Sequence, residues 1–113
     1  MDTSYMAAPG MKREKVIVNI SMATLMNYVS LAFDVNVNDL KSNSRRHRIL
    51  LARNVLWKEL RNRNYSVTEV GKITGHDHSS VSVAMRKYEA TVLNSEWARQ
   101  CIERLKKYIN VYE

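Results

Sequence analysis

The chain has 113 residues, with 18 Lys and Arg against 11 Asp and Glu, and its formal net charge at pH 7 is +7. This length predicts a single domain with a modest core, and the positive charge favours a polyanionic partner. The single cysteine, Cys101, excludes an internal disulfide, fits a reducing cytoplasm and is expected to pack in the core. Since the sequence has no apolar run of about 18 residues, we expect no membrane-spanning segment.

Pro9 and Gly10 lie together in a stretch of small residues near the N-terminus. This composition is typical of a mobile segment, so we expect residues 1–18 to form a flexible basic arm. Residues 19–113 are predicted to form one all-α domain, a compact bundle of about five to six helices. The predicted helical segments cover residues 21–33, 37–41 (one short turn), 49–60, 66–73, 77–92 and about 95–112.

Three of these helices begin with capping residues, and one of them is Asp77 at the start of the helix over residues 77–92. Ser21 precedes the apolar stripe of the first helix, and Ser66 with Glu69 forms a capping-box signature. The second long helix follows a basic run, Arg45-Arg46-His47-Arg48, and its core stripe consists of Ile49, Ala52, Leu56 and Leu60. The last helix is predicted to brace the domain by burying Trp97, Cys101, Leu105 and Tyr108.

The spacing of Gly71 and Gly75 predicts a helix-turn-helix. Two helices that meet steeply need a small residue where their backbones touch and a residue tolerant of positive φ in the turn. The turn leads into Asp77, His78, Ser79 and Ser80, which are expected on the exposed first turn of the next helix. Short hydrogen-bonding side chains at that place suit the reading of base edges in the major groove.

The segment Gly75-His76-Asp77-His78-Ser79-Ser80-Val81 resembles the signature of the C-terminal DNA-binding domain, domain IV, of the bacterial replication initiator DnaA, which contains Asp-His-Thr-Thr-Val. Three further segments resemble that family in the same order. They are Val37-Asn38-Asp39-Leu40, the basic loop and helix at residues 46–53, and Ser66-Val67-Thr68-Glu69-Val70-Gly71. The resemblance covers residues 19–113 and implies a Trp-repressor-like helix-turn-helix.

The resemblance implies contacts with double-stranded DNA at the matching positions. Base contacts are expected from Asp77, His78 and Ser79 in the major groove and from Arg45 in the minor groove. Backbone contacts are expected from Arg46, Arg48, Arg53, Asn54, Val67, Ser80, Ser82 and Arg86. The chemistry agrees, because a carboxylate accepts from cytosine N4 and an arginine suits a narrow minor groove. Both signature threonines are serines here, and His76 replaces a frequently basic residue, so the resemblance supports the DNA-binding role better than the exact target sequence.

DnaA proper couples this domain to an ATPase, whereas the chain contains no G-x-x-x-x-G-K-[ST] motif. We therefore expect a cofactor-free, non-enzymatic, stand-alone protein of phage or mobile-element origin that binds DnaA-box-like sites. It would act in the cytoplasm at the nucleoid and regulate replication initiation or transcription. A single module makes few contacts, so a homodimer, a protein partner at the origin or tandem sites would raise its affinity. No small-molecule substrate is expected.

Two other functions remain open. The chain is also consistent with a basic helical adaptor for an acidic protein, or with the DNA-targeting subunit of a packaging or transposition complex. His76, Asp77 and His78 include metal-ligand types, and Asp77, His78 and Ser79 include the residue types of a hydrolase triad. Residues this close on one helical turn lack the partner cluster of a metal site and the arrangement of a triad.

Overall fold

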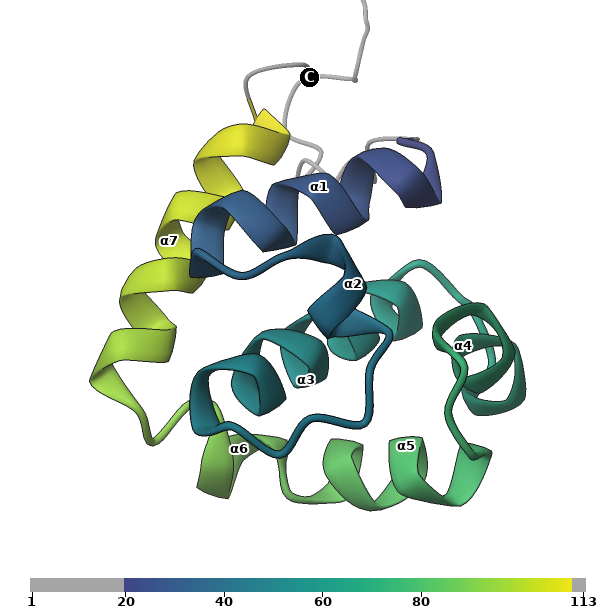
Figure 1. Cartoon of the computed structure of the whole chain (residues 1–113). Coiled ribbons are helices and arrows are strands. Elements are labelled where there is room, and N and C mark those ends of the chain that lie inside the picture. The colour runs from purple at the N-terminus through teal and green to yellow at the C-terminus, as the bar shows by residue number, and fades with distance from the viewer. Residues whose placement is uncertain (1–19, 111–113) are drawn as a thin grey trace, which may run out of the picture.

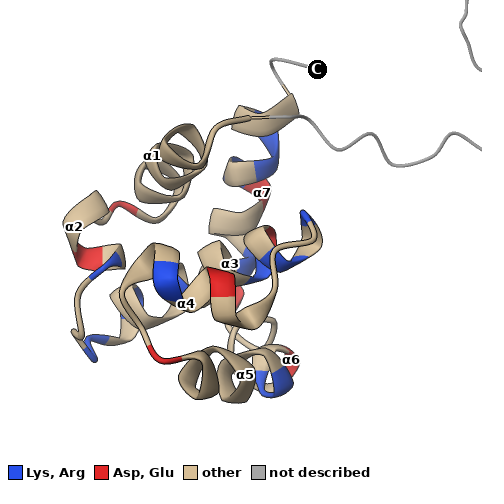
Figure 2. Ribbon diagram, turned by 90° about the vertical axis from the view of Figure 1, so that its right-hand side faces the viewer, with Lys and Arg blue, Asp and Glu red and all other residues tan. Residues whose placement is uncertain are grey.

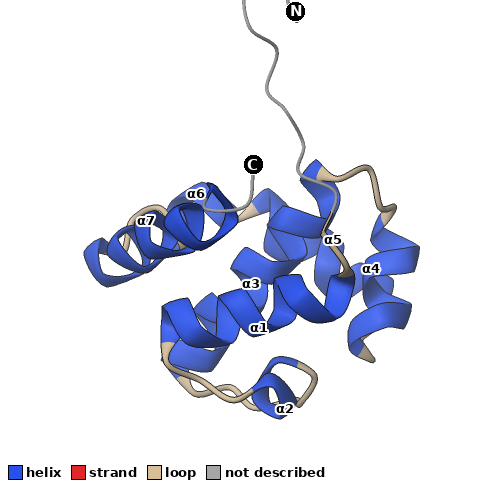
Figure 3. Ribbon diagram, turned by 90° about the horizontal axis from the view of Figure 1, so that it is seen from above, coloured by secondary structure: helices blue, strands red, loops and turns tan. Residues whose placement is uncertain are grey.

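The computed structural model describes residues 20–110, and every regular element in that range is a helix (Figure 3). In chain order the helices are α1 (Met22–Phe33), α2 (Val37–Leu40), α3 (His47–Asn62), α4 (Val67–Thr74), α5 (His78–Arg86), α6 (Tyr88–Thr91) and α7 (Glu96–Asn110). The predicted all-α class is therefore confirmed. The predicted arm at residues 1–18 lies outside the described range.

Helix α3 lies at the centre of the domain (Figure 1). Helices α1 and α7 pack against each other and against α3, while α4 and α5 pack on another side of it. Every residue of α3 from Leu51 to Trp57 is buried. A helix covered on all sides is typical of the centre of a bundle, and here the helices α4 and α5 pack against it.

The predicted core stripe of α3 is confirmed, because Ile49, Ala52, Leu56 and Leu60 are all buried. Helix α1 adds Leu25, Val29 and Phe33 to the same core. Burial of each such large apolar side chain stabilises the fold by about 1.5–3 kcal/mol. Because α4 and α5 pack against α3, this core also fixes the positions of the two helices of the helix-turn-helix.

Helix α7 braces the domain as predicted, with Cys101 and Leu105 buried. Trp97 and Tyr108 are only partly buried, contrary to the prediction that the helix buries them. Each ring instead lies at the edge of the core and contacts another aromatic ring, Trp97 with Phe33 at 5.5 Å between centroids and Tyr108 with Tyr28 at 5.9 Å. None of the helices in residues 20–110 has the length and apolarity needed to cross a membrane.

The described range contains seven helices, where five to six were expected, because the predicted helix 77–92 divides at Lys87. Lys87 has φ −97° and ψ 7°, and its N–H donates to the carbonyls of Met85 and Val83, which closes α5. The second long helix also begins at His47 and ends at Asn62, so it is longer at both ends than predicted.

The predicted caps at Ser21 and Ser66 are confirmed by side-chain hydrogen bonds, whereas Asp77 occupies the N-cap position of α5 without one. The Thr24 amide donates to Ser21 Oγ at 3.1 Å, which satisfies a free N–H at the start of α1. At the start of α4 the Glu69 amide donates to Ser66 Oγ at 3.1 Å, and the Ser66 amide donates to Glu69 Oε1 at 2.8 Å. Helix α4, the first helix of the helix-turn-helix, therefore begins at a defined residue.

Candidate nucleic-acid interface

The turn between α4 and α5 has the geometry that its two glycines predict. Gly75 adopts φ 73°, the left-handed conformation that closes α4. A Cβ on Gly71 would lie 2.5 Å from the carbonyl oxygen of His76, so only glycine allows this close approach. Val70 and Val81 are fully buried between the two helices. The helix-turn-helix is thus held by backbone contact and by its apolar core.

The first turn of α5 presents the predicted base-contacting residues to solvent. Asp77 occupies the N-cap position, and Asp77, His78, Ser79 and Ser80 are all exposed. The Asp77 and His78 side chains keep 66% and 63% of their surface accessible. None of these four side chains takes part in the core cluster, so all are available to a partner.

Hydrogen bonding within this turn favours the ionised form of Asp77. The Ser79 hydroxyl donates to the Asp77 carboxylate. This bond lowers the pKa of Asp77 below its ordinary value, with a smaller contribution from the nearby His78 ring. His78 Nδ1 lies 3.6 Å from Asp77 Oδ1, an ion pair whenever the imidazole is protonated. At neutral pH the turn therefore presents an ionised acceptor beside an imidazole.

The predicted minor-groove residue, Arg45, is exposed on the loop between α2 and α3. Local serine side chains order this loop. Ser42 Oγ donates to the Asp39 carbonyl at 2.8 Å and accepts from the Ser44 amide at 3.1 Å. Ser44 Oγ accepts from the Arg46 amide at 3.3 Å. Figure 2 shows a basic tip of this loop protruding from the same lower part of the domain as α5.

Two of the residues predicted to contact the DNA backbone are buried in the structure. Arg53 and Asn54 are only 4% and 5% exposed, because both lie on the buried part of α3. The Arg53 guanidinium donates to the carbonyls of Leu40, Asp39 and Ser44 at 3.3, 3.3 and 3.0 Å. Burial lowers the pKa of Arg53, yet an arginine keeps its charge in proteins. In this arrangement Arg53 holds the loop in place.

The other predicted backbone contacts differ in exposure. Arg46, Ser80 and Arg86 are exposed, whereas Val67 and Ser82 are half-buried. Arg48 is exposed, but its guanidinium carbon lies 4.9 Å from the centre of the Trp97 ring. A cation over an aromatic face is stabilised there, so Arg48 contributes to the packing of α7 against α3.

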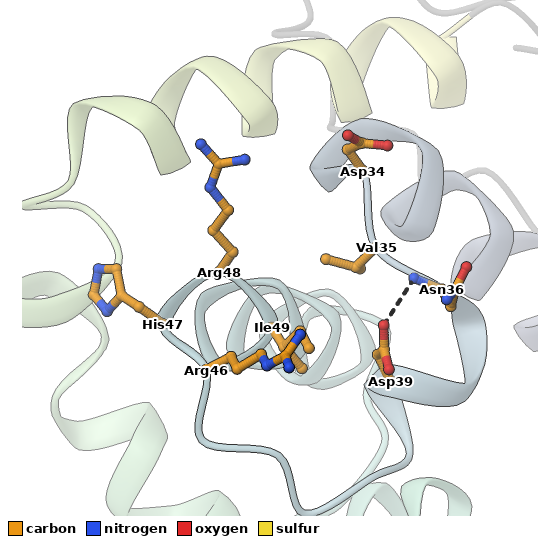
Figure 4. A pocket seen from close by; sticks show the side chains of 8 residues that line it. All are labelled: Asp34, Val35, Asn36, Asp39, Arg46, His47, Arg48 and Ile49. Atoms are coloured by element: carbon orange, nitrogen blue, oxygen red, sulfur yellow. Dashed lines mark hydrogen bonds between the residues drawn. The ribbon is translucent and has the colours of Figure 1, made fainter.

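A pocket of about 420 Å³ lies beside the start of α3, lined by Asp34, Val35, Asn36, Asp39, Arg46, His47, Arg48 and Ile49. Figure 4 shows that Arg46 and Arg48 point in different directions from this helix start. Two carboxylates accompany the two guanidiniums in the lining. The mixed charge makes this pocket a poorer place for a polyanion than the tip of the loop.

Three residues near the interface were not predicted to have their observed roles. Ser42 and Ser44 order the loop, and His76 joins this loop to the turn of the helix-turn-helix. The Ser-Asn-Ser spacing is a local signal for such hydrogen bonding. The contact of His76 with Ser42 joins residues 34 positions apart, so local sequence carries no signal for it.

Within residues 20–110, no three His, Cys, Asp or Glu side chains gather where they could hold a metal ion. Asp77 and His78 are near each other, but the His76 ring turns away from them, with Nε2 at the Ser42 carbonyl of the loop and Nδ1 at the Thr74 carbonyl of α4. The three residues that suggested a metal site therefore do not converge.

Comparisons with known proteins identify the same segments. Residues 22–87 match the family described as the helix-turn-helix of the bacterial DnaA protein. The chromosomal replication initiator protein DnaA 2 of Chlamydia pneumoniae is 33% identical over 93 residues, which are 80% of this chain and 20% of that protein. The chromosomal replication initiator protein DnaA of Kosmotoga olearia is 31% identical over 87 residues, 76% of this chain and 19% of that protein.

The chain thus spans about a fifth of the length of these relatives. The family match covers more than half of the chain, and it includes the glycine turn, the basic loop and the exposed first turn of α5. On this evidence the chain belongs to the family of bacterial DnaA helix-turn-helix domains.

Proposed function

We propose that this chain binds double-stranded DNA sequence-specifically at sites resembling the DnaA box. The observation that carries the proposal is the exposed first turn of α5, where an ionised Asp77 stands next to His78 and Ser79. An α-helix fits the major groove, and its N-terminal residues approach the base edges most closely.

Each side chain of this turn has a chemical role in the proposal. The Asp77 carboxylate accepts a hydrogen bond from cytosine N4, and His78 donates to or accepts from a neighbouring base edge. Since the Ser79 hydroxyl donates to Asp77, its remaining lone pairs are acceptors for a base amino group. Each well-placed contact of this kind discriminates against a wrong base by about 1–3 kcal/mol.

The basic loop supplies the second part of the proposed interface. Arg45 enters the adjacent minor groove, where the negative potential of a narrow groove attracts a guanidinium. Arg46, Ser80 and Arg86 are exposed and are assigned phosphate contacts in this proposal. Val67 and Ser82, which are half-buried, are assigned to the margin of the interface. Phosphate contacts set the affinity and the position on the duplex but carry no sequence information.

The proposed biological role is control of replication initiation or of transcription by occupation of such sites. The chain itself contributes DNA recognition and no ATP hydrolysis. A single helix-turn-helix buries little surface, so pairing of two copies, or a protein partner on neighbouring sites, would supply the affinity that one copy lacks.

Selection of bound duplexes from a random library at physiological salt tests this function. The wild type is expected to enrich a DnaA-box-like motif, and Asp77→Ala/His78→Ala is expected to blur it. Lys107→Met is the control, because it removes one positive charge from the last turn of α7 and should leave the motif unchanged.

Two results would contradict the proposal. If the wild type enriches no motif, sequence-specific binding is excluded, and the function as a basic adaptor for an acidic protein is favoured. A motif that stays unchanged in the double variant would remove the first turn of α5 from the readout.

A further inference from the structure

His76 makes three contacts that connect separate parts of the interface. It follows the turn residue Gly75 and is half-buried. Its Nε2 lies 2.8 Å from the carbonyl oxygen of Ser42, and its Nδ1 lies 2.8 Å from the carbonyl oxygen of Thr74. Its ring packs against Trp57 with centroids 5.2 Å apart and planes at 72°.

The chemistry of the two partners defines the protonation state that suits this position. A carbonyl oxygen only accepts hydrogen bonds, so both ring nitrogens of His76 face acceptors. A neutral imidazole has one N–H, and its second nitrogen would turn a lone pair toward a carbonyl oxygen at 2.8 Å. The imidazolium has two N–H groups and donates to both carbonyls.

These bonds join the two DNA-contacting segments of the proposed function. Ser42 belongs to the loop that carries Arg45, and Thr74 ends the helix before the turn that presents Asp77. We propose that His76, as the imidazolium, is a positioning residue that fixes the loop relative to the first turn of α5, so that specific DNA affinity depends on its protonation. This inference rests on the proposed function.

The segments that meet at His76 carry several charged residues. Asp39 and Lys41 come shortly before Ser42 in the chain, and Arg53 on α3 donates to the same loop. Lys72 lies on α4, and Asp77 directly follows His76. Within the described residues, none of these forms an ion pair with the His76 ring. The two carbonyl oxygens are therefore the direct partners that favour the charged ring.

The direction of the pH effect follows from this geometry. Both bonds exist when the ring is protonated, and one is lost when the ring is neutral. Loss of a charge-assisted hydrogen bond predicts about tenfold weaker specific binding at pH 8 than at pH 6, which corresponds to about 1.4 kcal/mol.

The first test measures binding to the selected duplex at pH 6 and pH 8 at constant ionic strength. His76→Phe keeps an aromatic ring against Trp57 but has no donor, so it should bind about tenfold more weakly than wild type at pH 6. His76→Arg keeps a charged donor at both pH values and should retain affinity while losing the His76 contribution to the pH dependence. His47→Gln removes another imidazole near the loop and serves as the control, with the wild-type pH ratio expected.

The second test needs no DNA and uses the wild-type chain. Long-range proton–nitrogen NMR at pH 6 should detect protons on both Nδ1 and Nε2 of His76. A neutral ring with one proton at pH 6 would overturn the inference, as would a pH 6 to pH 8 affinity ratio in His76→Phe equal to that of the wild type. If His76→Phe fails to fold by circular dichroism, the wild-type ring spectrum and His76→Arg decide the question. A doubly protonated ring in a chain that selects no duplex would overturn the proposed function and leave the positioning of the loop in place.

Discussion

Replacement of Arg53 by Met distinguishes two roles of this residue, the support of the basic loop and a direct contact with DNA. The guanidinium donates to three backbone carbonyls around the loop, at 3.0–3.3 Å. Methionine fills the apolar part of this space but has no donor, so Arg53→Met removes the guanidinium bond from all three carbonyls, of which Asp39 keeps its bond from Ser42 Oγ. The variant should therefore lose stability as well as DNA binding.

The expected loss follows from the burial of each bond. The bond to Leu40 is buried, and a buried acceptor left unsatisfied costs about 1–3 kcal/mol. The bonds to Asp39 and Ser44 are partly buried, and each contributes about 0.5–1.5 kcal/mol. Burial lowers the pKa of Arg53, so removal of the charge recovers part of this loss. We expect the free energy of unfolding to fall by about 2–4 kcal/mol, out of about 5–15 kcal/mol for a domain of this kind.

Urea unfolding followed by circular dichroism measures this change, with Arg45→Met as the matched control. Arg45 is exposed, so its replacement should change the free energy of unfolding by less than about 0.5 kcal/mol. The same control should reduce the salt dependence of DNA binding by about one unit of slope. The reasoning would be refuted if Arg53→Met unfolded like the wild type and reduced only the salt slope, because Arg53 would then act on phosphate.

Three further predictions concern other contacts of the fold and the interface. Gly71→Ala places a methyl group 2.5 Å from the His76 carbonyl oxygen, so unfolding in urea should become easier by about 1–3 kcal/mol, and an unchanged value would contradict the close approach. Burial raises the pKa of Tyr88 to about 12, while an unfolded tyrosine ionises near pH 10, so the stabilisation present below pH 10 should be lost between pH 10 and 12, by about 2–3 kcal/mol. Tyr88→Phe should flatten this alkaline decline, and equal slopes in the two proteins would count against it. Because the Ser79 hydroxyl lowers the pKa of Asp77, Ser79→Ala should raise that pKa in a carboxyl NMR titration, and the same pKa in both proteins would exclude the hydrogen bond as its cause.

Sequence patterns predicted the features whose physical causes are local. The caps at Ser21 and Ser66 depend on side chains three residues from their partners, and both are confirmed. The turn at Gly75 requires a positive φ, and the close approach at Gly71 requires the absence of a side chain. Such requirements restrict the residue type at one position, so they can be read without knowledge of the fold.

Features that depend on distant segments were not predictable in the same way. Arg53 looks like a basic residue following a basic run, but it is buried because the loop folds back over α3. The bond between His76 and Ser42 likewise requires that two segments meet in space. The division at Lys87 has no glycine or proline to mark it, so the local helical pattern carries no signal for it.

The residues that hold the first turn of α5 in place are not the residues that this turn presents to solvent. Gly71, Gly75 and Val81 determine its shape, whereas Asp77 and His78 point outward and take no part in the core. Substitutions at the outward positions therefore change what is read at little cost in stability, while substitutions at the inward positions are eliminated through unfolding. Over evolutionary time this separation lets one scaffold acquire new target preferences by single steps, and it lets a laboratory exchange the same positions without redesigning the domain.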